Sequence, residues 1–330
     1  YKRQDLLREV IINMRKEIQS LGGEFYFSHK LEDLKIEDDK VTKLIINGKS
    51  YKSGAYVLAL GHSARDSFNM LSDKISMENK NFAVGFRIEH KRESINNAQY
   101  NGKNTDLEGN ILPAASYNLS YNDKESGLST YTFCMCPGGY VVNASSEEGM
   151  TCVNGMSYHN RDGENSNSAI IVTIGKDIYG RNLLDGMRFQ REIEKKTYDL
   201  GEGKVPVQRY VDFKNNRASY ELGKIQPSIE SAYKLTNLRG IYPEEIEIML
   251  IKAIEYMGNR LEGFSSDDAI LSAAETRSSS PIRMLRDSDS KAINIDNLYL
   301  VGEGSGYSGG IVSSAVDGIK AAENILSKKN

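Results

Sequence analysis

The segment NLYLVGEGSGYSGGIVSSAVDGIKAAENIL, residues 297–326, is the strongest indication of fold in this sequence. Residues 297–301 form a short apolar run that indicates a buried strand, and the glycine-rich segment GEGSGYSGG follows at 302–310. An apolar stripe behind it predicts a helix, with Ile311, Ala315, Ile319, Ala322 and Leu326 on one face. A strand, a glycine turn and a helix N-terminus together direct free backbone N–H groups to one point, where they can bind an anion or a polarised carbonyl.

Residues 304–309, GSGYSG, also match G-x-G-x-x-G, but the usual meaning of that pattern does not apply here. A dinucleotide fingerprint needs a second strand and an acidic residue about 20 positions further on. The sequence given stops at Asn330, directly after the predicted helix. We therefore interpret the stretch as the closing strand and helix of a nucleotide-binding fold. The alternative is a glycine-rich connector in an ordinary α/β domain.

The same residues resemble the C-terminal FAD motif of flavoproteins with the glutathione-reductase type of fold. The resemblance rests on the strand, the Gly302-Glu303 pair, the small residues after it and the Gly-Gly-Ile start of the helix. It implies that Glu303 lies near the ribityl or pyrophosphate part of FAD, and the amides of Gly310 and Ile311 near the pyrimidine edge of the flavin. The cofactor-binding glycines implied in this turn are Gly302, Gly304, Gly306, Gly309 and Gly310.

The amino-acid composition excludes several classes of protein. The 330 residues suffice for two ordinary domains, and a net charge of −3 argues against nucleic acid as a partner. Three cysteines, an odd number, argue against a disulfide framework and for a reducing cytoplasm. No apolar run approaches the about 20 residues of a membrane span, and no secretory signal opens the sequence. We expect a cytoplasmic protein without a membrane segment.

The first part of the chain predicts a helix followed by β structure. An apolar stripe indicates a helix over 2–21, and Gly22-Gly23 ends it. Asn47-Gly48 is a strong signal for a type I′ hairpin turn. Strands are predicted for 24–27, 41–46, 49–51 and 55–60. The last of these, AYVLAL, is continuously apolar, as expected of a buried parallel strand, and it ends at Gly61 and His62.

This order of elements resembles the middle of a glutathione-reductase-type FAD domain, with Ala59-Leu60-Gly61-His62 in place of its Ala-Thr-Gly-like turn. Several phrases resemble a group of uncharacterised bacterial FAD-dependent dehydrogenases, the NAD(FAD)-utilising dehydrogenases. They are ALGHSARD at 59–66, FAVGFRIEH at 82–90, FCMCPGGYVV at 133–142 and ETRSSSPIR at 275–283. The resemblance implies FAD as cofactor and Gly61 and His62 near it, while a helix cap is the alternative role of His62. NAD(P)H is a candidate electron donor.

A fold of this type opens with a strand and a G-x-G-x-x-G helix that binds the ADP pyrophosphate. No such segment is found in the sequence given, which begins with Tyr1 rather than with methionine. We therefore expect a fragment that lacks this N-terminal unit, and in which FAD binding is weak or absent.

The middle of the chain predicts a second domain. Phe82, Val84, Phe86 and Ile88 alternate with polar residues, as in a half-buried strand. Further strands are predicted at 130–135, 140–143 and 169–174, and helices at 184–200 and 243–261. The predicted fold class is α/β: an N-terminally truncated FAD/NAD(P)-binding Rossmann-like domain, residues 1–75 and 268–330, with an inserted α+β substrate domain at 76–267.

Three side chains are candidates for chemistry. Cys134 and Cys136 could form a redox couple beside a flavin or act as nucleophiles, while buried small residues are the alternative. The resemblance places Arg277 near the isoalloxazine or at the domain junction, where it could hold an anionic substrate or stabilise the reduced flavin. A structural ion pair is the alternative for Arg277. Four scattered histidines and these cysteines indicate no metal site.

The function expected from these features is that of a FAD-dependent oxidoreductase that transfers hydride between a small-molecule substrate and flavin. The substrate and the oligomeric state do not follow from the sequence, and we expect the fragment by itself to be inactive. One rival is a tRNA-modifying flavoprotein, which the slightly acidic charge balance disfavours. The other rival is a non-catalytic scaffold that keeps the fold.

Overall fold

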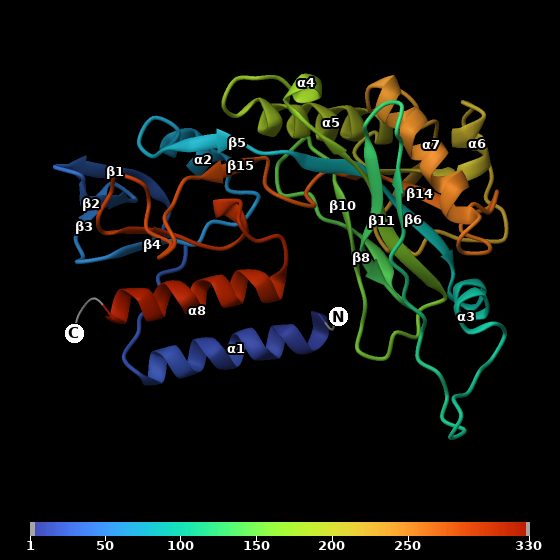
Figure 1. Cartoon of the computed structure of the whole chain (residues 1–330), viewed down its shortest axis with the longest axis horizontal. Helices are drawn as coiled ribbons and strands as arrows, with labels where there is room; N and C mark the ends of the chain where they lie inside the picture. Colours follow the sequence, from blue (N-terminus) through green and yellow to red (C-terminus); the bar gives the residue numbers. More distant parts are fainter. Residues whose placement is uncertain (1–3, 328–330) are drawn as a thin grey trace. The chain divides into compact units, whose positions relative to one another are not determined.

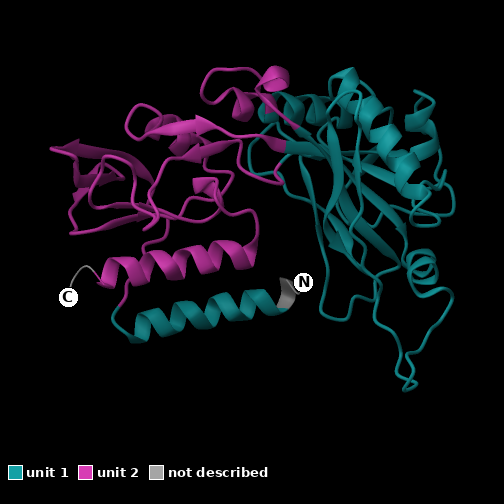
Figure 2. Cartoon of the chain, in the orientation of Figure 1, with its two compact units in different colours: residues 1–22, 83–173, 190–276 teal, residues 23–82, 174–189, 277–330 magenta. Residues whose placement is uncertain are grey.

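The computed structural model describes residues 4–327, which fall into two compact units that are described separately below (Figures 1 and 2). Unit 1 comprises residues 1–22, 83–173 and 190–276, and unit 2 comprises residues 23–82, 174–189 and 277–330. The predicted FAD-binding and substrate domains are an assignment of function, which this division into compact units does not test. That assignment stays a prediction.

Unit 1 is built on a seven-stranded sheet with the order β13-β12-β14-β6-β11-β8-β7 (Figure 1). The pair β12–β13 is parallel, whereas the pairs β12–β14, β14–β6, β11–β8 and β7–β8 are antiparallel. The strands are β13 (Tyr233–Leu235), β12 (Val205–Arg209), β14 (Ile270–Glu275), β6 (Phe82–Lys91), β11 (Asn165–Ile174), β8 (Ser129–Cys136) and β7 (Ser120–Asn122). A separate hairpin, β9 (Tyr140–Asn143) and β10 (Val153–Met156), packs through β10 against β8 and β14.

Helices complete unit 1. They are α1 (Gln4–Ser20), α3 (Arg92–Tyr100), α6 (Tyr210–Lys214), α7 (Glu244–Gly258) and α5 (Asp185–Gly201), whose first residues belong to unit 2. The prediction for α7 is confirmed, because Pro243 is its N-cap and acidic residues occupy its first turn. Its apolar stripe, which includes Ile246, Leu250 and Ile254, is fully buried, and the helix packs against β7 and β8.

The prediction that the strand beginning at Phe82 is half-buried is wrong. Residues 82–90 of β6 are buried throughout, including the charged Arg87 and Glu89, which have no solvent exposure. Alternation failed as a guide because the polar side chains have polar partners inside the unit: Arg87 lies 3.2 Å from the carboxylate of Glu275, and Glu89 accepts a hydrogen bond from the amide of Ser228. Charged groups are tolerated inside a protein only when such partners are present.

The N-terminal part of unit 2 is a three-stranded antiparallel sheet of β1 (Leu31–Glu37), β2 (Lys40–Ile46) and β3 (Lys49–Tyr51). The predicted hairpin is confirmed, since Asn47 and Gly48 have φ angles of 46° and 72°, as a type I′ turn requires. The predicted strand at 24–27 is wrong. Its aromatic side chains are exposed, and residues 23–26 lie in irregular chain that joins no sheet.

The rest of unit 2 surrounds two short strand pairs. β4 (Tyr56–Leu58) and β16 (Leu298–Leu300) are parallel, and β5 (Met77–Asn79) and β15 (Ile282–Met284) are antiparallel. The predicted buried parallel strand is therefore confirmed, although it is shorter than the run AYVLAL. The helical segments are α2 (Arg65–Leu71), α4 (Lys176–Tyr179), the 3-10 turn η1 (Glu303–Ser305) and α8 (Ile311–Ser327). The core includes Leu58, Phe68, Leu71, Ile282, Leu298 and Leu300.

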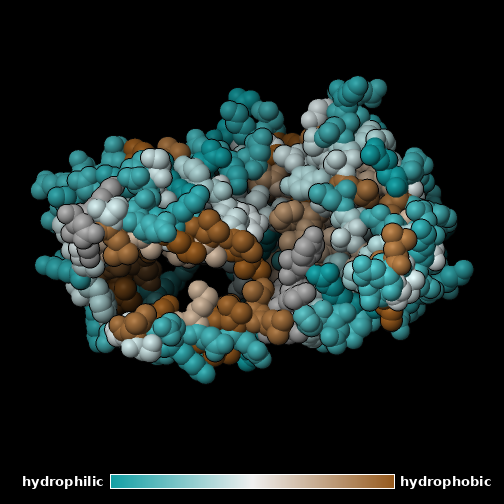
Figure 3. Space-filling view, turned by 60° about the horizontal axis from the view of Figure 1, so that its bottom comes forward, coloured by the Kyte–Doolittle hydropathy of each residue, from teal (hydrophilic) through white to brown (hydrophobic). Residues whose placement is uncertain are grey.

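Helix α8 attaches to unit 2 through its polar side. Its apolar stripe is open to solvent: Ile311, Ile319 and Leu326 are 56%, 59% and 63% exposed. Figure 3, in which the bottom of the Figure 1 view is turned forward, shows hydrophobic residues on the surface. A surface helix usually turns such a stripe towards a core. The stripe was predicted from the sequence, and no element among the described residues of unit 2 covers it.

Candidate functional site

The glycine-rich turn after β16 is held at both of its ends. The amide of Gly302 donates a hydrogen bond of 2.8 Å to the carboxylate of Asp317 in α8, and the amide of Gly304 donates one of 2.9 Å to the carbonyl of Leu60. Residues 303–305 form the single turn η1, and Gly306 closes it in the left-handed conformation. The turn is therefore fixed between the end of β4 and the first half of α8.

Parallel pairing of β4 and β16 brings together residues that the sequence separates widely. Their carboxyl ends place His62 beside Glu303, with 3.7 Å between the imidazole Nδ1 and a carboxylate oxygen. His62 is 7% exposed, whereas about a third of the Glu303 side chain is open to solvent. Arg277 donates a hydrogen bond of 2.7 Å from Nη1 to the hydroxyl of Ser63. Three predicted site residues thus gather where α/β sheets bind ligands.

Three glycines of the turn are required by the fold itself. Gly302 and Gly306 have φ angles of 77° and 85°, which side-chain-bearing residues rarely adopt. At Gly304 a Cβ atom would lie 2.1 Å from the carbonyl oxygen of Leu60, and at Gly306 it would lie 2.4 Å from that of Ile282. These glycines let the turn pack against β15 and the end of β4, so their presence needs no ligand to explain it.

Two other predicted glycines have open space around them. A Cβ atom at Gly61 or Gly309 would meet no atom within 4 Å, and neither residue has a left-handed φ. The fold therefore does not need glycine at these positions, and both leave main chain open to the approach of a ligand. The amide of Gly310 donates a hydrogen bond of 3.1 Å to the hydroxyl of Ser313, and its proposed position near the flavin stays a prediction. Ile311 begins α8 and is exposed.

Cations lie around the turn. The guanidinium groups of Arg283 and Arg286 lie 5.2 and 4.2 Å from the ring centroid of Tyr307. Lys80, which follows β5, is half-buried, and its pKa is lowered mainly by burial and then by repulsion from Arg283, although Glu303 opposes this effect. The environment of Glu303 thus contains an amine that loses its proton more readily than an ordinary lysine.

Cys134 and Cys136 lie in unit 1, at the end of β8. Cys134 has a φ angle of 47°, and the pairing of β8 with β11 shifts register here, so the two cysteines do not alternate as in a regular strand. Arg87 donates to the carbonyl of Cys134 over 2.7 Å and lies 3.3 Å from the sulfur of Cys136. Cys136 is thus buried beside the guanidinium of Arg87. A redox role for the pair stays a prediction.

The polar cluster around Arg87 was missed from the sequence. Arg87 also donates to the side-chain carbonyl of Asn167 over 2.9 Å. Nearby on β6, burial raises the pKa of Glu89, although hydrogen bonds from Ser228 and Asn165 oppose this. The available signal was the pair of charged residues inside the apolar run FAVGFRIEH, since charges within a buried strand need partners from elsewhere in the chain.

Two further classes of feature can be described for residues 4–327. None of the helices there is both long enough and apolar enough to cross a membrane. Within the same residues, no group of three or more histidine, cysteine, aspartate or glutamate side chains is arranged to hold a metal ion.

Comparisons with known proteins identify the family. Residues 81–278 match the family described as "FAD-dependent protein, C-terminal domain-like". An uncharacterized protein of Clostridium beijerinckii is 44% identical over 328 residues, and this chain spans 61% of its length. Among solved structures, CtdE in complex with FAD and pyridoxine 4-oxidase from Mesorbium loti align with 93% and 92% of this chain and with 56% and 57% of their own. Their identities to this chain are 9% and 10%, and the TM-score is 0.32 in each case, so these likenesses are too weak to indicate a fold or a function. The family match extends over more than half of the chain, so the protein belongs to the FAD-dependent protein, C-terminal domain-like family, and FAD is the cofactor that this family's description names.

Proposed function

We propose that the protein is a FAD-dependent oxidoreductase in which hydride passes between a small-molecule substrate and flavin, and that the turn at 302–310 lies against FAD. The observation that carries the second part is the open space at Gly61 and Gly309, two glycines that the fold does not require. Both belong to the segments that follow the parallel strands β4 and β16. The family supplies the cofactor, and these glycines leave room for it.

Each side chain near the turn has a proposed task. When bound, FAD supplies the redox chemistry, and the protein contributes position and electrostatics. Glu303 accepts hydrogen bonds from hydroxyl groups of the cofactor, and His62, at 3.7 Å, orients its carboxylate. Arg277 is held by Ser63, and its guanidinium places positive charge where an anionic substrate or a reduced flavin carries negative charge. NAD(P)H is the electron donor that we propose to test first.

We further propose that the pyrophosphate of FAD is bound by a part of the longer protein that lies outside residues 1–330. The Clostridium beijerinckii relative supports this proposal, because 39% of its length has no counterpart in this chain. The activity and the substrate of the whole protein are likewise proposals.

Flavin absorbance tests the proposal. FAD would be titrated into this chain, into the Clostridium beijerinckii relative, and into an extended chain that joins this sequence to the residues by which the relative is longer. Saturable binding by the relative and the extended chain, with weaker binding by residues 1–330 alone, is the expected result. If neither longer protein takes up FAD, the flavoenzyme proposal fails. If all three bind equally well, the proposed external pyrophosphate site fails.

A further inference from the structure

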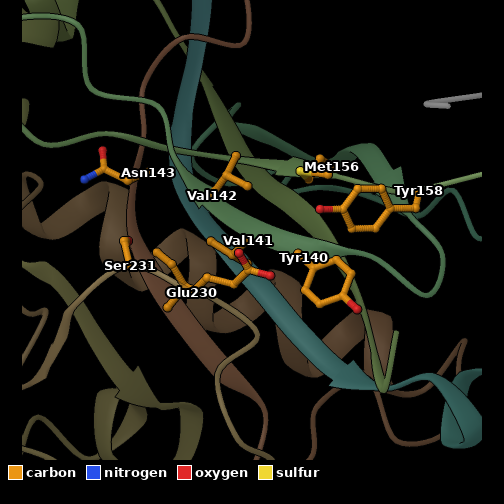
Figure 4. Close-up of a pocket in the computed structure, with 9 residues that line it drawn as sticks. Tyr140, Val141, Val142, Asn143, Met156, Tyr158, Glu230 and Ser231 are labelled. Carbon is orange, nitrogen blue, oxygen red and sulfur yellow. The ribbon is translucent and has the colours of Figure 1, made fainter. Parts of the chain in front are cut away.

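Unit 1 contains a surface pocket that no step of the proposed flavin chemistry uses (Figure 4). Its volume is about 200 Å³, and its walls come from the hairpin β9–β10, from Tyr158 and from the segment 229–231. The nine lining residues are Tyr140, Val141, Val142, Asn143, Met156, Tyr158, Ile229, Glu230 and Ser231. The volume equals that of about seven water molecules in the liquid, which suits a small head group rather than a whole nucleotide.

The walls of the pocket are anchored to the interior of unit 1. The hydroxyl of Ser228 accepts a hydrogen bond of 2.9 Å from the amide of Val141 and donates to the buried carboxylate of Glu89. This joins the segment that carries Glu230 to the hairpin. On the other side of the hairpin, a Cβ atom at Gly155 would lie 2.0 Å from the guanidinium of Arg87, so β10 packs directly on the polar cluster. The pocket is therefore held in shape without a ligand.

The turn at Pro137-Gly138-Gly139 sets the position of Tyr140. Gly138 has a φ angle of 50°, and a Cβ atom there would lie 1.8 Å from the carbonyl oxygen of Arg161. Gly139 has the carbonyl oxygen of Met156 2.3 Å from the place of its Cβ. This close packing connects the start of β9 to the segment around Tyr158. The glycines of the motif CMCPGGY thereby shape the aromatic end of the pocket.

The chemistry of the lining is that of a cation site. The ring centroids of Tyr140 and Tyr158 lie 5.6 Å apart with the rings at 68° to each other, so the two rings pack edge to face and together form one wall of the pocket. The faces of aromatic rings attract ammonium groups within about 6 Å of the centroid. Figure 4 shows the carboxylate of Glu230 pointing towards Tyr140 and the hydroxyl of Tyr158 pointing towards Val142. Glu230 is the single charged residue of the nine, and lysine, arginine and histidine are absent from the lining.

We propose that this pocket binds a small organic cation, whose ammonium group lies against the aromatic wall formed by Tyr140 and Tyr158 and beside the carboxylate of Glu230. The apolar side chains of Val142, Met156 and Ile229 contact the carbon atoms of the ligand. The site belongs to unit 1 alone, so it stands or falls independently of the flavin proposal. An anionic ligand would meet the carboxylate without a compensating cation, and a neutral ligand would leave that carboxylate unused.

Nuclear magnetic resonance of methionine-methyl-labelled protein tests the proposal without any flavin. The signal of Met156, assigned with Met156→Leu, reports on the pocket during titration with choline. The matched probe is the neutral analogue of choline in which a carbon atom replaces the nitrogen. Choline is expected to shift the signal saturably. The neutral analogue is expected to bind at least about tenfold more weakly, because it lacks the cation–π and ionic contacts.

Variants separate the proposed contacts from general effects. Glu230→Gln and Tyr158→Ala are each expected to weaken choline binding about five- to tenfold, whereas Tyr158→Phe, which keeps the ring, retains most of it. Tyr220→Ala and Glu221→Gln remove an exposed tyrosine and an exposed glutamate of the same unit outside the pocket, so they should leave the affinity unchanged. The proposal is overturned if choline does not bind, if the neutral analogue binds equally well, or if the control variants weaken binding as much.

Discussion

Replacing single glycines of the turn by alanine should separate stability from cofactor binding. In Gly304→Ala the new methyl group would lie 2.1 Å from the carbonyl oxygen of Leu60 and 3.1 Å from its Cβ, so the turn must move away from the end of β4. Overpacking of this kind typically costs about 1–3 kcal/mol of unfolding free energy. In Gly309→Ala the methyl group meets no atom within 4 Å, and the change in stability should stay within about 0.5 kcal/mol.

Affinity for FAD should depend on Gly309 and Gly61, the two glycines whose replacement leaves stability nearly unchanged. If Gly309 is open because the cofactor approaches its main chain, the methyl group of Gly309→Ala occupies the space that the ligand needs. We expect affinity for FAD to fall about tenfold or more, which corresponds to about 1.4 kcal/mol. The same change at Gly61 should act in the same direction, since its surroundings are equally open.

The assay combines two measurements on each variant. The unfolding free energy is measured in urea, with hydrogen exchange of unit 2 amides as the readout. The affinity is measured by FAD titration, in this chain or the extended chain, whichever binds FAD. A Gly309→Ala variant that is stable and binds FAD normally would refute the placement of the cofactor against this turn. A Gly304→Ala variant as stable as the parent would refute the packing argument itself.

Three further predictions concern ionisable side chains. Burial lowers the pKa of His90 from its ordinary value of 6.5 to about 4. Between these two pH values the unfolded chain binds a proton that the folded chain does not, so the unfolding free energy should fall by about 2 kcal/mol between about pH 7 and pH 5. Urea unfolding at several pH values should show this loss in the parent and in His159→Gln but not in His90→Phe. Arg87→Met removes the cation beside the buried carboxylate of Glu275 and should lower the unfolding free energy of unit 1 by about 3–5 kcal/mol in urea titrations. Burial raises the pKa of Asp317, but hydrogen bonds from Arg286 and from the amide of Gly302 outweigh it and hold this pKa below its ordinary value. Asp317→Asn should therefore loosen α8 and reduce the protection of its amides from hydrogen exchange at neutral pH. The protection of the parent should fall to that of the variant, compared at the same pH, as pH falls through the pKa of Asp317.

Elements whose signals are local were predicted well from the sequence. The hairpin at Asn47-Gly48 follows from two residues that accept left-handed φ angles, and α7 follows from Pro243 and the stripe behind it. The short parallel strand β4 follows from a continuous apolar run. In each case the residues that determine the element lie within the element or next to it.

Elements that depend on distant partners were predicted poorly. Residues 24–27 have strand-forming side chains but no neighbouring strand, so they remain irregular and exposed. Conversely, β6 buries Arg87 because Glu275, 188 positions away, lies beside it. The pocket around Tyr140 was missed for the same reason, since its lining comes from separate segments that share no motif. Spacing along the chain gives no information on contacts of this range.

The glycine-rich turn shows a subtler limit of sequence reasoning about the site. Within GEGSGYSGG, Gly304 and Gly309 are equivalent members of one motif, and the resemblance assigns both to the cofactor. Their surroundings differ completely: a side chain at Gly304 would collide with Leu60, whereas one at Gly309 would meet open space. A motif therefore mixes glycines that a turn needs for its own packing with glycines that leave room for a ligand. Only the second kind carries information about binding, which is why the test of function rests on Gly61 and Gly309 rather than on the match to the motif as a whole.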